Sequence, residues 1–292
     1  MSLFLNVTLN GVANGMIFAA VALALVFIYR ATRIINFAQG AMGMLTTFIA
    51  FSLLDKGLGY WEAFVAALAI GFVLGVVVER VLIRPLHGKP EINPVIVTIG
   101  LLVVLEGLAG SIWGNSSRGF PPAFSQTGLR IGSTRLDFSH LDLFIVGAVV
   151  AVMLLTLVLF RGTNLGLRMR ASAFAPEIAR LLGVRVGRIL TLGWGIAALA
   201  GSLAALLVAP TTSFGPYFMD LNLVFGFTAA VIGGLESPVG ALVGGLITGL
   251  SISYVGGYLG SSLQPLGALA LLMVALMIRP QGIFARPQAR RV

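Results

Sequence analysis

Long apolar runs separated by short polar stretches dominate this 292-residue sequence. A helix needs about 20 apolar residues to cross a hydrocarbon core about 30 Å thick. Hydrophobic residues make up 58% of the chain and charged residues 10%, whereas soluble domains are roughly half apolar and a quarter charged. We therefore predict an all-α, polytopic integral membrane protein with about eight or nine transmembrane helices or half-helices. The candidate segments lie near residues 8–29, 38–54, 61–83, 93–113, 142–160, 187–209, 221–234, 239–258 and 262–279.

Lysine and arginine are unevenly divided between the predicted loops. With the N-terminus outside, fifteen of the nineteen fall on the cytoplasmic side, where the positive-inside rule expects them. These fifteen are Arg30, Arg33, Arg80, Arg84, Lys89, Arg161, Arg168, Arg170, Arg180, Arg185, Arg188, Arg279, Arg286, Arg290 and Arg291. The other four are Lys56 and three in the longer loop 114–140, where the rule weakens: Arg118, Arg130 and Arg135. The count predicts an external N-terminus and a cytoplasmic C-terminus.

Small residues recur at every fourth position within several candidate spans. Helices in lipid associate through close backbone contact at such residues, although glycine is also generally common in membrane helices. We predict tight helix contacts along these rows. They are Gly11, Gly15 and Ala19; Gly71 and Gly75; Gly193, Ala197, Gly201 and Ala205; and Gly240 and Gly244.

Two polar interruptions are candidate parts of a translocation pathway or hinge. The segment 221–234 reaches only about 21 Å as a helix, so we expect a break at "GGLESP". A second interruption is "INFAQG". Discontinuous helices often lie near substrate paths in transporters, but each place is equally suited to a structural hinge. The candidate residues are Asn36, Phe37, Gln39, Gly40, Gly233, Gly234, Ser237 and Pro238.

The sequence argues against several functional classes. A membrane enzyme needs clustered carboxylates, metal ligands or an activated nucleophile, and no such cluster is visible; His87 and His140 fall on opposite predicted sides. The phosphate-loop pattern of ATPases is absent, so we expect no nucleotide cofactor in this chain. The net charge of +9 comes from arginines flanking spans, which favours anionic lipid headgroups over nucleic acid as the counter-charge.

Glu106 is the one clear ionisable residue inside a predicted span. An ionised carboxylate there costs on the order of 2.5 to 3.5 kcal/mol on insertion scales. It is a candidate pathway residue, and the alternative is a hydrogen-bonded residue at a helix interface. A lone acid is weak support for ion coupling.

The loop at about 162–187 is unusually polar for this chain. Pro176 suits the first turn of a helix, Glu177 favours its positive end, and Gly183 can end it in the left-handed conformation. The predicted helix is about two turns long and carries an apolar edge that includes Ile178 and Leu182. Such a helix could lie on lipid or dock on another protein.

Three segments carry a resemblance to a known family. "EIARLLG" at 177–183 resembles the E-A-A-x-x-x-G loop of ABC importer permeases, with Ile178 in place of one alanine. "RIINFAQGAMGM" at 33–44 and "FTAAVIGGLESPVGALVGGLI" at 227–247 resemble signatures of the branched-chain amino acid permeases of the LivH type. The likeness covers nearly the whole chain, and Glu106 stands where that family leads us to expect a neutral residue.

The resemblance implies one permease domain over 1–292 in a bacterial inner membrane, serving an ATP-driven importer of branched-chain or related amino acids. It implies a LivM-like second permease, two cytoplasmic ATPase subunits that hold ATP and Mg²⁺, and an external substrate-binding protein. A homodimer, transport of urea or short amides, and a self-sufficient channel or facilitator remain alternatives. The residues that it assigns to the ATPase interface are Arg168, Arg170, Ala171, Ala173, Glu177, Ala179, Arg180, Leu182 and Gly183.

Overall fold

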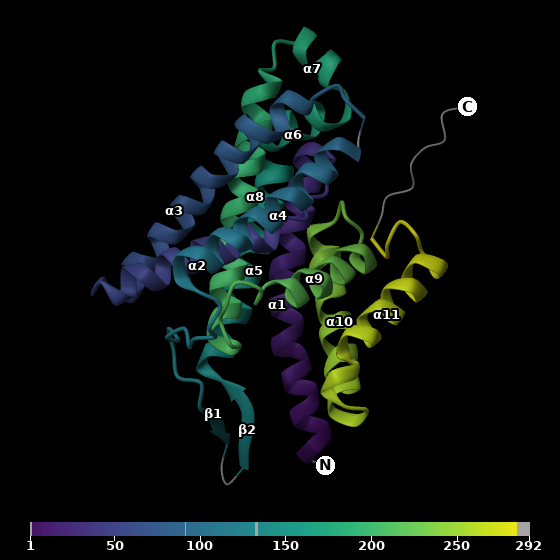
Figure 1. Cartoon of the computed structure of the whole chain (residues 1–292). Helices are drawn as coiled ribbons and strands as arrows, with labels where there is room; N and C mark the ends of the chain where they lie inside the picture. The colour runs from purple at the N-terminus through teal and green to yellow at the C-terminus, as the bar shows by residue number, and fades with distance from the viewer. Residues whose placement is uncertain (1, 91, 132–133, 285–292) are drawn as a thin grey trace.

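The computed structural model describes residues 2–90, 92–131 and 134–284 (Figure 1). Its α-helices are α1 (Ser2–Thr32), α2 (Gln39–Asp55), α3 (Tyr60–Val78), α4 (Ile92–Trp113), α5 (His140–Gly162), α6 (Asn164–Phe174), α7 (Pro176–Leu181), α8 (Val186–Val208), α9 (Asp220–Gly233), α10 (Pro238–Tyr258) and α11 (Gln264–Ile278). A π-helical turn η1 (Glu79–Ile83) extends α3, and 3-10 turns form η2 (Arg84–Leu86), η3 (Ala209–Thr211) and η4 (Ser261–Leu263). Strands β1 (Gly128–Ile131) and β2 (Thr134–Ser139) pair antiparallel.

The predicted all-α membrane fold is confirmed. Within the described residues, seven helices are long and apolar enough to cross a membrane, and each of the nine predicted segments coincides with a helix. Helix α2 has 17 residues and α9 has 14, so the number of complete crossings remains a prediction. The short hairpin β1–β2, inside the loop 114–140, was not predicted from the sequence.

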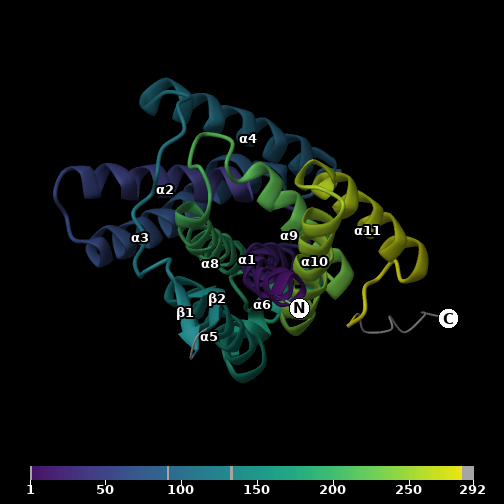
Figure 2. The same cartoon turned by 90° about the horizontal axis from the view of Figure 1, so that it is seen from below.

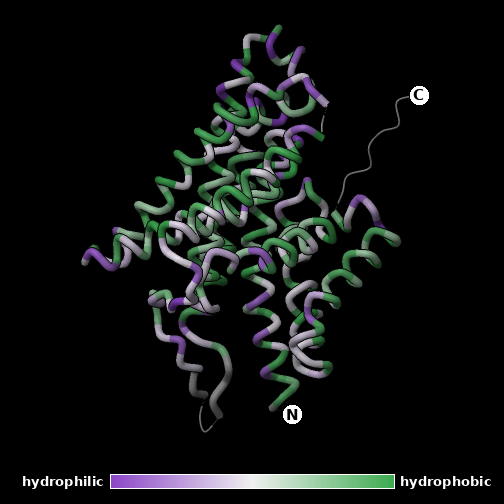
Figure 3. Tube along the Cα trace, in the orientation of Figure 1, coloured by the Kyte–Doolittle hydropathy of each residue, from purple (hydrophilic) through white to green (hydrophobic). Residues whose placement is uncertain are grey.

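Helices α1 and α8 occupy the centre of the molecule, and α4, α5 and α11 lie at its edge (Figures 1 and 2). In the most apolar stretch of α1, 89% of the residues are buried. In Ser261–Ile278, which comprises η4 and α11, only 6% are buried. Figure 3 shows that apolar residues nevertheless continue along the outer helices. Outer apolar faces suit a chain whose surrounding solvent is lipid.

The rows of small residues mediate close helix contacts, as predicted. Gly15 of α1 lies against Gly245 of α10, where an added Cβ would come within 3.0 Å of the Gly245 carbonyl oxygen. On the other side of the centre, Gly75 of α3 faces Trp194 of α8, at 2.5 Å from a built Cβ to the Trp194 carbonyl oxygen. Helix α2 meets α8 at Gly43 in the same way. The core is therefore assembled through backbone contact, as expected where lipid removes the hydrophobic drive between helices.

The helix ends form two groups, and contacts between neighbouring segments hold each group together. Arg84 donates to the carbonyl oxygen of Gly187 at 3.1 Å at one end. At the other end the Arg118 amide donates to the Phe214 carbonyl oxygen at 2.8 Å. The start of α1 and the hairpin lie at the end opposite α6 and α7 (Figure 1). These groups match the two sides of the predicted topology, although which side is cytoplasmic remains a prediction. The predicted cytoplasmic residues Arg286, Arg290 and Arg291 lie outside the described residues.

The predicted break at "GGLESP" is confirmed, and 221–258 forms an antiparallel helical hairpin. Helix α9 ends at Gly233 and α10 begins at Pro238. Backbone atoms of Gly233 and Gly240 face each other closely across the hairpin. After α11, the amide of Ile283 donates to the Ile232 carbonyl oxygen at 2.8 Å. This bond satisfies a carbonyl group that the end of α9 would otherwise leave unpaired.

Candidate functional site

The predicted coupling loop folds as two short helices, α6 and α7, beyond the end of α5. The Thr163 hydroxyl caps α6 by accepting from the Gly166 amide at 3.1 Å. The chain passes so close to the end of α5 there that a side chain at Gly166 would overlap the Leu159 carbonyl group. Ala175 leaves the helical region, as residues before proline commonly do, and Pro176 starts α7. The predicted helix from Pro176 is confirmed, whereas α6 was missed.

Helix α7 ends at the predicted glycine. Gly183 has φ +80°, a conformation that side chains rarely adopt. Its amide donates to the Arg180 carbonyl oxygen at 2.9 Å, and the Val184 amide donates to the Ala179 carbonyl oxygen at 2.9 Å. This pair of bonds is the Schellman motif. Gly183 therefore fixes the direction in which the chain enters α8.

The apolar edge of α7 points away from the protein. Leu181 is 87% exposed and Leu182 78% exposed, and Ile178 is also exposed. On the opposite side, Ala179 is buried against Val186 of α8. The helix is thus anchored through one alanine, while three larger apolar side chains are mostly exposed.

The other predicted interface residues surround this edge. Arg168, Arg170 and Arg180 are exposed, and Ala171 and Ala173 are partly buried. Arg180 pairs with Glu177 at 3.7 Å between Nη1 and Oε1, a pair open to solvent. The predicted ATPase-facing residues therefore gather on one projecting segment. Contact with an ATPase remains a prediction.

A buried polar cluster, absent from the sequence analysis, ties α3 to the start of α8. Glu79 is fully buried, and its Oε2 accepts from the Thr191 hydroxyl at 2.7 Å and from Arg84 Nη2 at 3.1 Å. Arg84 Nε also donates to Glu79 Oε1 at 3.3 Å. We call Glu79, Arg84 and Thr191 the α3–α8 clamp. In the sequence, the sign of this cluster is an acid and a base five residues apart, Glu79 and Arg84. A π-helical turn brings residues at this spacing together, whereas a regular α-helix does not.

The "INFAQG" segment forms the break between α1 and α2. Asn36 is fully buried, its Oδ1 accepts from the Ala38 amide at 3.0 Å, and its Nδ2 donates to Gln39 Oε1 at 3.0 Å. Gln39 Nε2 donates in turn to the Ala197 carbonyl oxygen of α8 at 2.8 Å. The predicted helix break is confirmed, and these bonds attach the break to α8. A hinge role for this segment remains a prediction. A role in substrate binding remains a prediction.

The same break lies close to α9. The rings of Phe37 and Phe227 have centroids 6.2 Å apart, and a Cβ built on Gly40 comes within 3.3 Å of the Met219 side chain. The amide of Phe37 also donates to the Thr98 hydroxyl of α4 at 3.4 Å. Helices α4, α8 and α9 therefore meet at this predicted pathway segment.

The second predicted interruption is a tight, capped turn. Gly234 has φ +97°, and the Ser237 hydroxyl caps α10 by accepting from the Gly240 amide at 2.9 Å. Glu236, in the same turn, forms an ion pair with Arg33. Burial lowers the pKa of Arg33 and the Glu236 contact raises it, and the net shift is upward. This turn therefore gives a structural role to four of the predicted residues, Gly233, Gly234, Ser237 and Pro238. A pathway role for them stays a prediction.

Glu106 of α4 lies beside Asp220 at the start of α9. Its Oε1 is buried without a hydrogen-bond partner in the described structure. Glu106 is thus a helix-interface residue with a second carboxyl group as its neighbour, which the sequence analysis did not anticipate. Among the described residues, no three His, Asp or Glu side chains gather as a metal site.

Members of both predicted groups line one cavity, namely Arg170 and Ala173 of the interface set and Ser237 and Pro238 of the pathway set. Helix α8 separately joins α7 to the break between α1 and α2. Its first residue, Val186, packs on α7, and Ala197 in the same helix accepts from Gln39. Eleven residues of helix span about 16 Å. The arrangement connects the projecting segment formed by α6 and α7 to the break between α1 and α2 through one continuous helix.

Comparisons with known proteins identify the family of this chain. The family described as "Branched-chain amino acid transport system / permease component" matches residues 7–279. The chain is 29% identical to the high-affinity branched-chain amino acid transport system permease protein LivH of Escherichia coli K12, over 99% of this chain and 98% of that protein. It is 30% identical to the corresponding protein BraD of Pseudomonas aeruginosa, with the same coverage. The Salmonella typhimurium LivH protein is 28% identical over 99% and 98%. This chain therefore belongs to the family of permease components of branched-chain amino acid transport systems.

Proposed function

We propose that this chain is a membrane-spanning permease subunit of an ATP-driven importer, located in a bacterial inner membrane, and that it forms part of the pathway for branched-chain amino acids. Family membership over residues 7–279 supports the substrate class. The observation that carries the ATP-driven mechanism is α7, whose exposed leucines and glycine-fixed end suit insertion into a groove on another protein.

In this proposal the ATPase moves α7, and α8 carries the displacement into the membrane. Gly183 and Ala179 fix α7 to the start of α8, and the α3–α8 clamp makes α3 follow. At Ala197 the displacement reaches Gln39 and hence the break between α1 and α2. A helix is stiff enough to act as such a lever, and a short unwound break is a place where a path can open.

The proposal requires other subunits. ATP and Mg²⁺ belong to two cytoplasmic ATPase subunits, and the substrate arrives on an external binding protein. A LivM-like second permease completes the membrane part, with a homodimer of this chain as the alternative. The chain itself then has no catalytic residue, and energy enters only through contact at α7.

Reconstitution tests this function. The complex of both permeases and the ATPase, in proteoliposomes with the binding protein, is expected to accumulate labelled leucine when ATP is present. The chain reconstituted alone is expected to be inert. Leucine or urea flux through the isolated chain, down its gradient and without ATP, would instead identify a facilitator. Preferential ATP-driven uptake of urea or short amides would keep the importer and change its substrate.

The sidedness of α7 is tested separately, because the chain contains no cysteine. Single cysteines at Glu177 and Ser117, both exposed, are expected to react from the cytoplasmic and the external side, respectively. Labelling of position 177 from outside would end the coupling proposal, since the ATPase is cytoplasmic.

A further inference from the structure

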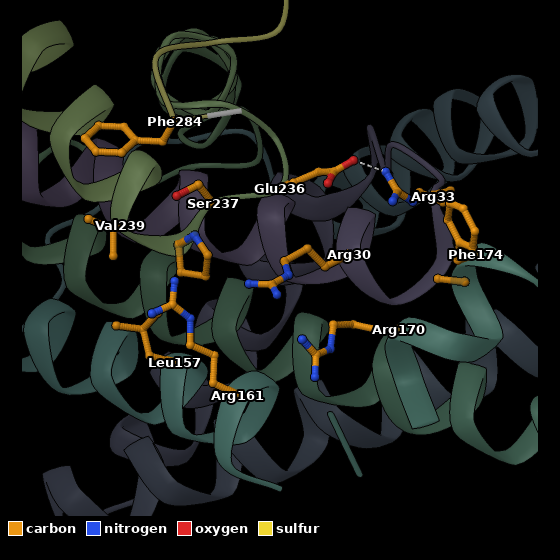
Figure 4. A pocket seen from close by; sticks show the side chains of 12 residues that line it. Arg30, Arg33, Leu157, Arg161, Arg170, Phe174, Glu236, Ser237, Val239 and Phe284 are labelled. Carbon is orange, nitrogen blue, oxygen red and sulfur yellow. Dashed lines mark hydrogen bonds and ion pairs between the residues drawn. The ribbon is translucent and has the colours of Figure 1, made fainter. Parts of the chain in front are cut away.

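A cavity of about 490 Å³ lies at the end of the molecule that carries α6 (Figure 4). Its walls come from the ends of α1 and α5, from α6, from the α9–α10 turn and from the segment after α11. Its lining residues include Arg170 and Ala173, which the resemblance assigns to the ATPase interface, and the candidate pathway residues Ser237 and Pro238. The proposed coupling route from α7 through α8 to Gln39 does not pass through this cavity.

The cavity is strongly basic. Arg30, Arg33, Arg161 and Arg170 line it, and Glu236 is the one acid among its described lining residues. Arg33 is the arginine paired with Glu236, as the dashed line in Figure 4 marks. Arg30 packs on the ring of Phe160 at 4.3 Å from its guanidinium carbon to the ring centroid. Figure 4 shows the guanidinium groups of Arg30, Arg161 and Arg170 directed into the same region.

Apolar side chains form the rest of the wall. Leu157, Phe174, Val239 and Phe284 line the cavity with the arginines. On α5, one residue beyond Leu157, Val158 belongs to an exposed apolar face. The cavity therefore combines a cluster of guanidinium groups with an apolar wall that continues onto a lipid-facing helix. A soluble anion needs only the first of these features, whereas a phospholipid uses both.

We propose that this cavity binds the phosphate headgroup of an anionic phospholipid, with its acyl chains along α5. Guanidinium groups bind phosphate oxygens through paired, charge-assisted hydrogen bonds. Basic pockets between membrane helices are suited to anionic headgroups. The bound lipid joins α1, α5, α6 and the α9–α10 turn, so it stabilises the base of the coupling segment.

The test is a titration of the purified full-length chain, in a neutral detergent, with phosphatidylglycerol, followed by its thermal unfolding midpoint. Phosphatidylglycerol is expected to raise the midpoint, and phosphatidylcholine to leave it nearly unchanged. Added salt should weaken the response, because partly exposed charges are screened. This comparison uses the wild-type chain alone, so it does not depend on whether a variant folds.

Charge removal localises the response. In Arg161→Gln/Arg170→Gln, the phosphatidylglycerol concentration for half of the response should rise about tenfold or more, the scale expected for lost charged hydrogen bonds. The matched control is Arg80→Gln/Lys89→Gln, which removes two charges from exposed residues on the same predicted side and should keep the wild-type response.

Four outcomes would overturn the proposal. Equal responses to the two lipids, or an unchanged response in Arg161→Gln/Arg170→Gln, would show that the arginines of this cavity do not bind the anionic headgroup. A rise produced by inorganic phosphate alone would assign the cavity to a soluble anion. Loss of the lipid response on assembly with the ATPase would assign it to an acidic side chain of that subunit.

Discussion

Apolar side chains are buried in the glycine-packed centre of the molecule but exposed on its projecting segment, α6 and α7. Helices α1 and α8 bury theirs through backbone contacts that leave no space for a Cβ. Helix α7 exposes Leu181 and Leu182 almost completely. Lipid can cover the exposed faces of α4, α5 and α11, but the predicted topology places α7 beyond the membrane. The centre is thus packed within one chain, whereas the exposed leucines at α7 are the surface that we propose the ATPase covers.

The largest effect is expected from a side chain inserted into the packed centre. A Cβ at Gly245 would lie 2.5 Å from the Ala19 Cβ and 2.6 Å from the Gly15 carbonyl oxygen. Overpacking costs about 1–3 kcal/mol where side chains can move, and here backbone atoms are in the way. Gly245→Leu should therefore yield little folded protein, as measured by yield and by monodispersity in detergent.

A glycine of the outer helices supplies the matched control. A Cβ built on Gly147 of α5 meets nothing within 4 Å, and leucine there extends a lipid-facing apolar surface. Gly147→Leu should express and behave like the wild type. Equal yields for both variants would contradict the close contact between α1 and α10.

The next effect lies where the two regions meet, at the α3–α8 clamp. Glu79→Ala removes the carboxylate that accepts from Thr191 and Arg84, and hydrogen bonds to a charged group contribute about 1.5–3 kcal/mol. We expect a lower unfolding midpoint for Glu79→Ala. The midpoint of Glu79→Gln should fall less, because its amide oxygen can still accept from Thr191. Identical midpoints for the alanine and glutamine variants would show that the hydrogen bond from Thr191 to residue 79 does not stabilise the fold.

A smaller effect on folding, with a large effect on assembly, is expected at the end of α7. Gly183→Arg forces a side chain into φ +80°, at about 1–2 kcal/mol, and places a bulky charge beside the exposed leucines. The variant should insert normally and lose co-purification with the ATPase.

Gly57 is the matched control for this change. It has φ +90° and open space around it, and the topology places it on the external side. Gly57→Arg should carry the same backbone strain and retain the ATPase. Normal co-purification of both variants would show that α7 is not the docking element.

The parts that could be predicted from sequence differ between the two regions for physical reasons. Apolar runs of about 20 residues identified every long helix, and rows of small residues identified close contacts of α1, α3, α8 and α10, because these features depend on local composition. Pro176 and Gly183 identified α7 in the same way. Contacts between distant residues could not be predicted: Glu79 meets Thr191 through a π-helical turn, and Asp220 meets Glu106 through the packing of α4 and α9.

The smallest effect is expected at Glu106, which lies neither in the glycine-packed centre nor on the projecting segment that carries α7. It lies at the interface of α4 and α9 beside Asp220, and its Oε1 lacks a hydrogen-bond partner in the described structure. Glu106→Gln keeps the shape of the side chain and supplies an amide that can donate to Asp220, so uptake of labelled leucine by the reconstituted complex should stay near the wild-type rate. Glu106→Lys adds length and a charge in the membrane and should transport less. If Glu106→Gln assembles normally but loses nearly all uptake, the carboxyl group itself takes part in transport, and α4 then belongs to the pathway and not to its lipid-facing surround.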